Sequence, residues 1–482
     1  MYSLLYTEHV TVFRYQSSIA DMPFSPAGLK QSLPTAKVIT DADLLEQYRR
    51  DNSLLSPAGR PRAAVIAQSV EDVTSLLDYA HSRNVAVVTR GAGSGLSGGA
   101  NALDGCIVLI TTALDQIHDL NQLDMYATVQ PGVLNARLKD RARETRLFYP
   151  PDPASFKFST LGGNVATNAG GLCCVKYGVT GDYVMALDVV LADGTRAQTG
   201  STARKSVAGY DLTSLMVGSE GTLGVIVSAT LRLAPLAEAP ATIVAQFDTM
   251  EKVGSLPASL AEAGITPSML ELVDGVTVSV IEKHFPMGLG QGTGAMIIAQ
   301  ADTPDRESTV TRIADIATLL GASETFLAAD PIEGEMLVQG RRLAFTALEK
   351  EPGVALLDDV SVPISQIPNL IAEIATISAR HGVRIGTFGH LGDGNLHPTL
   401  LYNPRDPDQV TRATAAFDAI VYAALNLGGS VTGEHGVGTL KLSHLEDQLG
   451  EPARRLHAEI KRTFDPKGIL NPGKVIRSTT PV

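Results

Sequence analysis

Glycine-rich segments in the first half of the chain constrain its fold more than any other feature. Of 482 residues, 45 are glycine, and the excess over the usual share of about 7% gathers in residues 90–105, 162–181 and 218–224. Glycine reaches positive φ and allows close backbone approach without steric cost. These segments therefore predict a first half that is built around loops.

The length and hydrophobicity of the chain indicate a globular protein of two or three domains. One hydrophobic core usually serves no more than roughly 250–300 residues, and 44% of these residues are hydrophobic, enough to bury sizeable cores. A stretch rich in Pro and Ala at residues 235–240 separates the loop-rich part from a second part. We predict an N-terminal extension with a lead-in helix in residues 1–61, a first domain in 62–236 and a second domain in 237–478.

Charge, apolar runs and cysteines exclude several classes of protein. Lys and Arg number 39 against 51 Asp and Glu, a formal charge of −12, so nucleic acid is not an expected partner. No apolar run reaches the roughly 18 residues of a membrane helix, and residues 1–20 lack the features of a targeting segment. The three cysteines, Cys106, Cys173 and Cys174, are too few for a disulfide framework and are expected to be small buried residues. The expected location is the cytoplasm, with peripheral attachment to a membrane left open.

Local patterns predict an α+β protein. Apolar residues at helical spacing predict a helix over residues 70–83. Strands are expected at 85–89 and 106–110, and a hairpin at 185–198. Beyond residue 240, strands alternate with amphipathic helices, which predicts a mixed or antiparallel sheet covered by helices.

A loop in the first half satisfies the pattern G-x-G-x-x-G at residues 93–98, directly after a predicted strand. Residues 101–105 are too short and too turn-prone for the helix that a Rossmann dinucleotide site requires at this point. Successive backbone N–H groups can still form a nest that holds an anion, with Arg90, Ser94 and Ser97 as further donors. A diphosphate would fit this loop, although a glycine-rich turn without a ligand explains the pattern equally well.

A second pattern combines three histidines and a glutamate in glycine-flanked segments of the second half. If residues 393–394 form a two-residue hairpin turn, His390 and His397 face each other, with Cβ atoms about 4.5–5.5 Å apart. Glu434 and His435 lie in another tight loop, and two imidazoles with one carboxylate leave an open position on a bound metal ion. A single histidine of this kind is more often a hydrogen-bonded core or surface residue, but the three together favour a catalytic metal site.

Five segments of the first half, in this order, resemble the FAD-binding domain of the vanillyl-alcohol oxidase/PCMH flavoprotein superfamily over residues 62–236. They are residues 90–99, 131–132, 150–155, 162–171 and 217–224. The resemblance implies that the first segment cradles the FAD diphosphate, that the third and fourth line the isoalloxazine and ribityl chain, and that the last meets the adenosine part. The cofactor-binding residues that it implies are Arg90, Gly91, Ala92, Gly93, Ser94, Gly95, Ser97, Gly98, Pro131, Gly132, Pro151, Asp152, Ser155, Gly162, Gly163, Asn168, Gly170, Gly171, Gly178, Glu220, Gly221, Gly224, Ile226 and Asn471. Because the diphosphate loop carries Ser94 and no histidine, we expect FAD to be held without a covalent bond.

The histidine motifs resemble the C-terminal domain of the FAD-linked D-2-hydroxy-acid dehydrogenases. This family includes the glycolate oxidase flavin subunit, D-lactate dehydrogenase and D-2-hydroxyglutarate dehydrogenase. Residues 465–474, after a helix expected from Thr439 to Phe464, fit the same family. The resemblance implies a divalent metal ion (Zn, Mn or Fe) with His390, His397 and Glu434 as its ligands, and His435 as the catalytic base.

The predicted substrate-binding residues depart from the family pattern at two points. Arg341 matches the arginine that binds the substrate carboxylate, and Arg342 could serve instead if the helix phase differs by one. Family members usually carry Trp three residues before this arginine, where this chain has Val338 and no Trp elsewhere. The D-2-hydroxyglutarate enzymes need a basic residue at a position that falls here within Leu-Leu-Asp, residues 356–358. A monocarboxylic substrate such as lactate or glycolate is therefore expected.

The resemblance implies an activity, namely oxidation of a D-2-hydroxy acid to the 2-oxo acid with hydride transfer to FAD and metal-assisted deprotonation of the hydroxyl. The reduced flavin then needs an electron acceptor, for which a cytochrome, a quinone, an electron-transfer flavoprotein or a partner subunit are the candidates. Three alternatives stay open: a D-2-hydroxyglutarate dehydrogenase, an FAD-dependent transferase of the alkylglycerone-phosphate synthase type, and a non-catalytic flavin subunit. A homodimer is compatible with these features.

Overall fold

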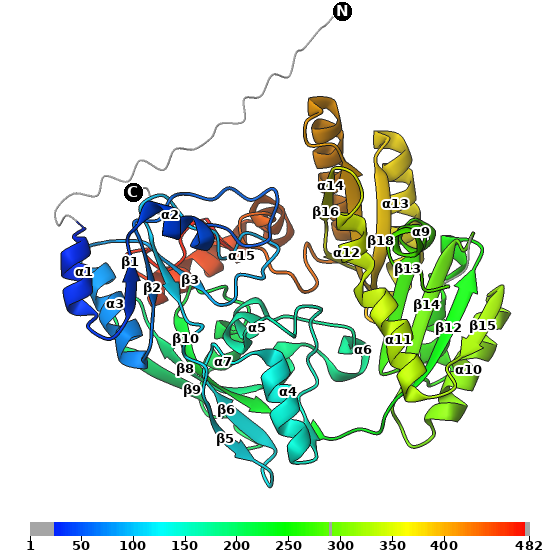
Figure 1. Cartoon of the computed structure of the whole chain (residues 1–482), viewed down its shortest axis with the longest axis horizontal. Coiled ribbons are helices and arrows are strands. Elements are labelled where there is room, and N and C mark those ends of the chain that lie inside the picture. The colour runs from blue at the N-terminus through cyan, green and yellow to red at the C-terminus, as the bar shows by residue number, and fades with distance from the viewer. Residues whose placement is uncertain (1–23, 289–291, 478–482) are drawn as a thin grey trace, which may run out of the picture.

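The computed structural model describes residues 24–288 and 292–477. The expectation for residues 1–20 lies outside them. Figure 1 shows two halves side by side, each with its own sheets and helices. No helix among the described residues is long and apolar enough to cross a membrane.

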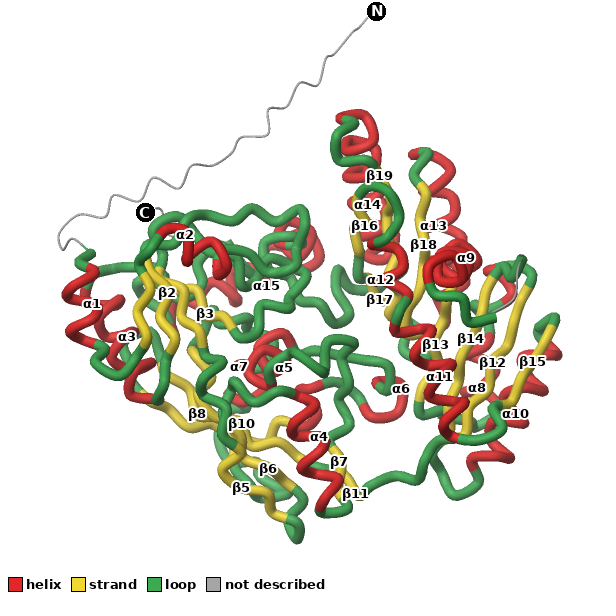
Figure 2. Tube along the Cα trace, viewed as in Figure 1, coloured by secondary structure: helices red, strands yellow, loops and turns green. Residues whose placement is uncertain are grey.

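The first half begins with a four-stranded sheet in the order β1-β2-β4-β3, of which Figure 2 labels β2 and β3. Its strands are β1 (Lys37–Ile39), β2 (Ala63–Ile66), β3 (Val87–Arg90) and β4 (Ile107–Ile110), and all but β1 run parallel. Helices α1 (Pro26–Ser32) and α3 (Val70–Ser82) pack against each other, and α3 buries Val73, Leu76 and Leu77 against this sheet. Short helical turns α2 (Ala42–Leu45) and η1 (Glu46–Tyr48) follow β1. The predicted helix and both predicted strands are confirmed to within two residues, and residues 91–106 contain no helix, as predicted.

The second sheet of this half is antiparallel, with strand order β5-β6-β10-β8-β9. Its strands are β5 (Ile117–Asn121), β6 (Tyr126–Val129), β8 (Val184–Val190), β9 (Arg196–Gly200) and β10 (Val225–Arg232). The predicted hairpin at residues 185–198 is confirmed as β8 and β9. Short elements connect these strands: α4 (Asn135–Glu144), β7 (Leu147–Phe148), α5 (Leu161–Thr167), α6 (Cys174–Tyr177), η2 (Thr180–Tyr183), α7 (Leu212–Met216) and β11 (Ala234–Pro235), which pairs with β7.

The second half is one large antiparallel sheet with strand order β15-β12-β14-β13-β18-β19-β16, and β17 pairs with β19. The strands are β12 (Ala241–Phe247), β13 (Met269–Asp274), β14 (Ala295–Ala301), β15 (Glu324–Leu327), β16 (Val354–Leu357), β17 (Val360–Ser361), β18 (Arg384–His390) and β19 (Asn395–Tyr402). Along β13, Leu270 and Leu272 enter one core while Met269 and Val273 enter another. Since successive strand residues point to opposite faces, both faces of this sheet are buried.

Helices cover both faces of this sheet, as the sequence predicted. One core includes residues of α8 (Leu256–Glu262), α10 (Arg306–Leu319), α13 (Ile367–His381) and α14 (Pro407–Asn426). The other includes residues of α9 (Gly275–His284), α11 (Pro331–Arg342) and α12 (Ala344–Glu349). Two short turns, η3 (Met250–Lys252) and η4 (Ile364–Gln366), complete the half.

The end of the chain returns to the first half. Helix α15 (Leu442–Phe464) starts three residues later than predicted and is interrupted at Gly450, where φ is +67°. Its residues Ile460 and Phe464 pack on the core of the antiparallel five-stranded sheet. Leu470 then bridges to Val87 and joins the core of the four-stranded sheet. Asn471 and Lys474 donate hydrogen bonds to the carbonyl oxygen of Gly99, so this segment helps to hold the first glycine loop in place.

Candidate active site

A cavity of about 740 Å³ lies between the glycine loops of the first half and the second half. The second half contributes Arg342, Phe345, Thr346, Glu349, Glu434 and His435 to its wall. The predicted cofactor residues in the wall are Gly91, Ala92, Gly93, Ser94, Gly95, Ser97, Pro131, Ser155, Gly162, Gly163, Glu220, Gly221, Gly224 and Ile226. Its volume lies in the range of small-molecule and cofactor sites. The structure thus brings both predicted motifs to one cavity.

The loop at residues 92–99 has the free donors that a diphosphate needs. Within the described ranges, none of its backbone N–H groups donates a hydrogen bond to another part of the chain. Gly93 has φ of +73°, and a Cβ there would lie 2.0 Å from Nη2 of Arg90. Nη1 of the same arginine is buried without a hydrogen-bond partner. A nest of free amides beside an unsatisfied guanidinium suits an anionic ligand, so the residues fit the diphosphate of FAD.

The remaining predicted cofactor residues lie outside the cavity wall, and several have partners within the chain. Asn168 ends α5 at φ of +51° and accepts a hydrogen bond from the amide of Gly181. Asn471 donates hydrogen bonds to the carbonyl oxygens of Gly99 and Glu220. The others are Arg90, Gly98, Gly132, Pro151, Asp152, Gly170, Gly171 and Gly178. Direct contact of these residues with FAD stays a prediction, and for the two asparagines the structure shows a role in holding loops.

The predicted register of the β18–β19 hairpin is wrong. His390 pairs with Asn395 and Phe388 pairs with His397, so the turn contains four residues, 391–394, instead of two. Backbone hydrogen bonds from the amides of Asp393 and Gly394 to the carbonyl of His390 close this longer turn. The two histidines are nevertheless neighbours, because residues two apart on a strand point to the same face. Their ring centroids are 5.0 Å apart.

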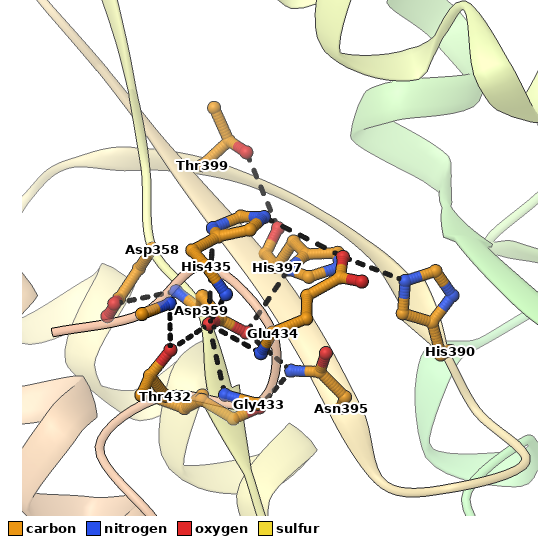
Figure 3. A network of polar contacts seen from close by, with 12 residues as sticks. Asp358, Asp359, His390, Asn395, His397, Thr399, Thr432, Gly433, Glu434 and His435 are labelled. Atoms are coloured by element: carbon orange, nitrogen blue, oxygen red, sulfur yellow. Dashed lines mark hydrogen bonds and ion pairs between the residues drawn. The ribbon is translucent and has the colours of Figure 1, made fainter. Parts of the chain in front are cut away.

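Four side chains converge at the second-half wall of the cavity (Figure 3). Oε1 of Glu434 lies 3.1 Å from Nε2 of His390 and 3.3 Å from Nε2 of His397. The ligand atoms of these three residues all lie within 4.8 Å of one another. His435 stacks on His397 with ring centroids 5.0 Å apart, and its Nε2 is 3.7 Å from the same glutamate oxygen. Two imidazoles and a carboxylate are a donor set that Zn, Mn or Fe accepts, so the residues fit the predicted metal ion.

Two buried carboxylates behind these donors were not predicted. Oε1 of Glu271, on β13, lies 2.7 Å from Nδ1 of His390, so the other ring nitrogen of His390 faces Glu434. Oδ2 of Asp359 accepts hydrogen bonds from the amides of Gly433, Glu434 and His435. Histidine ligands of metals commonly donate their second ring N–H to such a carboxylate. No sequence spacing connects either residue to the histidines, because Glu271 lies on β13 and Asp359 lies in the connection between β16 and β17.

Burial and neighbouring charges set the protonation of the site. Burial lowers the pKa of His435, although the carboxylate of Asp359 acts in the opposite direction. The imidazole is therefore neutral at neutral pH and can accept a proton. Burial also lowers the pKa of His390, but Glu271 and Glu434 outweigh it and hold that pKa well above its usual value.

The two arginines at the end of α11 occupy different environments. Nη2 of Arg341 pairs with Oε2 of Glu271 at 2.7 Å, and its guanidinium stacks on Phe388, away from the cavity wall. Arg342 lies in the wall and pairs with Asp152 at 3.1 Å. Its Nε and Nη1 are buried without a hydrogen-bond partner. Nε of Arg341 is also buried without a hydrogen-bond partner, so the two arginines differ mainly in that only Arg342 lines the cavity. The assignment of the substrate carboxylate to Arg341 stays a prediction.

The cysteines are free thiols with different exposure. Cys106 is buried, as predicted, but Cys173 and Cys174 are only half-buried, because they lie at the start of α6 beside the cavity-lining loops. Burial raises the pKa of both Cys173 and Cys174. Protonated thiols are poor nucleophiles.

Comparison with known sequences identifies the family. The profile described as "FAD linked oxidases, C-terminal domain" matches residues 236–475, and the one described as "FAD binding domain" matches residues 61–200. The glycolate oxidase subunit GlcD of Bacillus subtilis is 39% identical over 417 residues, which cover 86% of this chain and 89% of the relative. The chain belongs to the FAD-linked oxidase family.

Other relatives of this FAD-linked oxidase agree with the predicted fold and cofactor. D-lactate dehydrogenase of Anaerostipes hadrus is 33% identical over 451 residues, which cover 91% of this chain and 94% of the relative. The structure of p-cresol methylhydroxylase with substrate bound has a TM-score of 0.80 at 18% identity and covers 95% of this chain and 97% of that one. An alkyldihydroxyacetonephosphate synthase structure has a TM-score of 0.71 at 19% identity and covers 94% of this chain and 86% of that one. The resemblance to the flavoprotein superfamily is confirmed, and the chain is an FAD-dependent oxidoreductase with an α+β fold.

Proposed function

We propose that this enzyme oxidises a D-2-hydroxy acid of the lactate or glycolate type to the corresponding 2-oxo acid. The observation that carries the proposal is the single cavity that has the FAD-binding loops on one side and Glu434 with His435 on the other. A substrate in this cavity would contact the cofactor and the histidines together. Relatives of high coverage are named glycolate oxidase subunit and D-lactate dehydrogenase, which supports the same class of substrate.

The cofactors would be FAD, held without a covalent bond, and one divalent metal ion. Residues 92–99 would hold the FAD diphosphate, while Ser94 and the protonated thiols of Cys173 and Cys174 offer no reactive group for covalent attachment. His390, His397 and Glu434 would hold the metal ion. When bound, FAD supplies the hydride acceptor and the metal ion supplies a Lewis acid for the substrate oxygens.

His435 would remove the hydroxyl proton of the substrate. It lies in the cavity wall, and its low pKa leaves the imidazole neutral and able to accept a proton on Nε2. Its Nδ1 faces Oδ2 of Asp359 at 4.0 Å. The buried carboxylate favours the imidazolium that forms when the proton arrives, and its hydrogen bonds to the loop amides fix the ring's position.

Groups in the cavity wall favour a monocarboxylic substrate. The two unpartnered N–H donors of Arg342 could bind the one carboxylate next to the reacting carbon. Glu349, in the same wall, would repel a second carboxylate. Asp358 is buried against Lys441 at 2.7 Å, so that lysine has a partner already. These features argue against a D-2-hydroxyglutarate dehydrogenase.

The transferase alternative has support only at the level of fold, from a solved structure of low sequence identity. A non-catalytic flavin subunit would not need the three proposed metal ligands, nor the two buried carboxylates, Glu271 and Asp359, that lie behind them. The electron acceptor is proposed to be a cytochrome, a quinone, an electron-transfer flavoprotein or a partner subunit. A homodimer and a cytoplasmic location, with peripheral membrane attachment left open, belong to the same proposal.

A screen of D- and L-2-hydroxy acids with an artificial electron acceptor tests the proposed function. We expect turnover with D-lactate or glycolate, little with L-lactate or D-2-hydroxyglutarate, and loss of turnover when a chelator removes the metal ion. Preference for D-2-hydroxyglutarate would overturn the proposed substrate class. Turnover that is indifferent to complete metal removal would overturn the metal assignment.

A further inference from the structure

The loop after His435 crosses from the second half to the first. The carboxylate of Glu220 accepts hydrogen bonds from the amides of Val437 at 2.7 Å, through Oε1, and Gly438 at 2.9 Å, through Oε2. Both oxygens of this carboxylate are therefore occupied by the backbone that directly follows the proposed catalytic base. Glu220 itself lies in the glycine-rich segment predicted to meet FAD.

Ser97 of the diphosphate loop makes a second set of contacts with the same segment. Its carbonyl oxygen accepts hydrogen bonds from the amides of Thr439 at 3.0 Å and Leu440 at 3.1 Å. Its hydroxyl donates to the carbonyl oxygen of His435 at 3.2 Å. The diphosphate loop thus contacts the loop of the proposed base on both sides of Val437.

The fit between these loops leaves no room for larger side chains. A Cβ at Gly436 would lie 2.9 Å from Oε1 of Glu220, and a Cβ at Gly438 would lie 2.1 Å from the carbonyl oxygen of Ser97. Both glycines have positive φ, +85° and +50°. Glycine is the residue that accepts this backbone conformation without strain, and here it also allows the loops to touch.

The position of Glu220 is fixed by its own backbone. Its φ is +51°, its amide donates to the carbonyl of Ala166 at 2.8 Å, and its carbonyl accepts from the side chain of Asn471 at 2.7 Å. The residue is 7% exposed. A carboxylate held this firmly can set the position of the segment that it binds.

We propose that Glu220 is a positioning residue, which docks the loop after His435 onto the first half, beside the FAD-diphosphate loop, and so orients the imidazole in the cavity. The inference rests on the proposed function insofar as His435 is the base. Glu220 would then position the loop of His435 in addition to its predicted contact with FAD. An error of about 1 Å in the placement of a catalytic group can cost 100-fold in rate, so the effect should be measurable.

The test compares E220Q with the wild-type holoenzyme and with D274N as a matched control. Asp274 is also a buried carboxylate that accepts hydrogen bonds from two backbone amides, those of Thr277 and Thr387, but it lies outside the cavity wall. For each protein we would measure FAD and metal content, hydrogen exchange of the amides at 436–440, and the rate of flavin reduction at saturating D-lactate.

We expect E220Q to keep its FAD and metal, to exchange amides 436–440 faster, and to reduce its flavin at least 10-fold more slowly, whereas D274N matches the wild type in all three. E220D should recover part of the rate, since it restores a carboxylate. If E220Q does not fold, E220D alone provides the test, because its shorter side chain weakens the same hydrogen bonds to Val437 and Gly438 while it keeps the charge. Unchanged exchange at 436–440, or a normal rate of flavin reduction in an E220Q that retains its FAD, would overturn the inference. Hydrogen exchange needs no substrate. If none of the 2-hydroxy acids reduced the flavin of the wild-type enzyme, that result would therefore refute the proposed function and leave the exchange test of Glu220 intact.

Discussion

Replacing Glu271 by Gln removes the carboxylate that links His390, a proposed metal ligand, to Arg341. Its two oxygens lie 2.7 Å from Nδ1 of His390 and 2.7 Å from Nη2 of Arg341, and the residue is completely buried. Loss of such an outer carboxylate typically lowers metal affinity 10- to 100-fold, or by about 1.4–2.7 kcal/mol. The unpaired charge left on buried Arg341 adds a loss of stability of up to about 3–5 kcal/mol.

Metal content after dialysis against a graded series of chelator concentrations measures the first effect, and thermal unfolding measures the second. The matched control is E351Q. Glu351 also joins a histidine and an arginine, with 2.9 Å to His284 and 3.0 Å to Arg384, but it lies outside the cavity wall. E271Q should lose metal at lower chelator concentration, and E351Q should not. Equal metal retention in E271Q and wild type would refute the idea that Glu271 supports metal binding through His390.

The remaining predictions concern the base, the arginines and pH. H435A should keep FAD but reduce it about 100-fold more slowly, as loss of a positioned base does; stopped-flow absorbance checks this, and a normal rate would remove His435 from that role. R342K should raise KM for the hydroxy acid at least 10-fold, because it removes a planar pair of N–H donors. R341K should mainly lower thermal stability. If steady-state assays show the increase in KM in R341K and not in R342K, Arg341 is the residue that binds the substrate carboxylate. Burial raises the pKa of Glu220 from 4.5 to about 7, so between these values the folded state binds more protons than the unfolded state, and the free energy of unfolding should fall as pH rises. Denaturant titrations from pH 4.5 to 7 should show this fall in wild type and a flatter profile in E220Q; identical profiles would contradict the assignment of the raised pKa.

Local signals in the sequence were sufficient for much of the fold. Apolar spacing located α3 and the parallel strands, and turn residues located the β8–β9 hairpin, because these elements depend on neighbours in sequence. The glycine segments also identified the cofactor loops, since positive φ at residues such as Gly93 leaves a clear mark in composition.

The rest of the site depends on contacts between distant segments. The hairpin register failed because the number of residues in the turn, four instead of two, is set by closure onto the His390 carbonyl. Glu271, on β13, and Asp359, between β16 and β17, escaped prediction because a single buried carboxylate has no sequence pattern of its own. Only Arg342 of the two neighbouring arginines lies in the cavity wall. Consecutive helix residues differ by about 100° in direction, and periodicity does not resolve that difference at a helix end.

We propose that one cavity joins FAD to a histidine site that binds a metal ion, and that a D-2-hydroxy acid is oxidised there. Anaerobic addition of D-lactate to the purified holoprotein, followed by visible absorbance, is the decisive experiment. We expect the flavin to bleach, chelated protein to retain oxidised flavin under the same conditions, and added metal to restore bleaching. Flavin that stays oxidised with D-lactate, glycolate and longer D-2-hydroxy acids, in protein shown to contain both FAD and metal, would contradict the proposal.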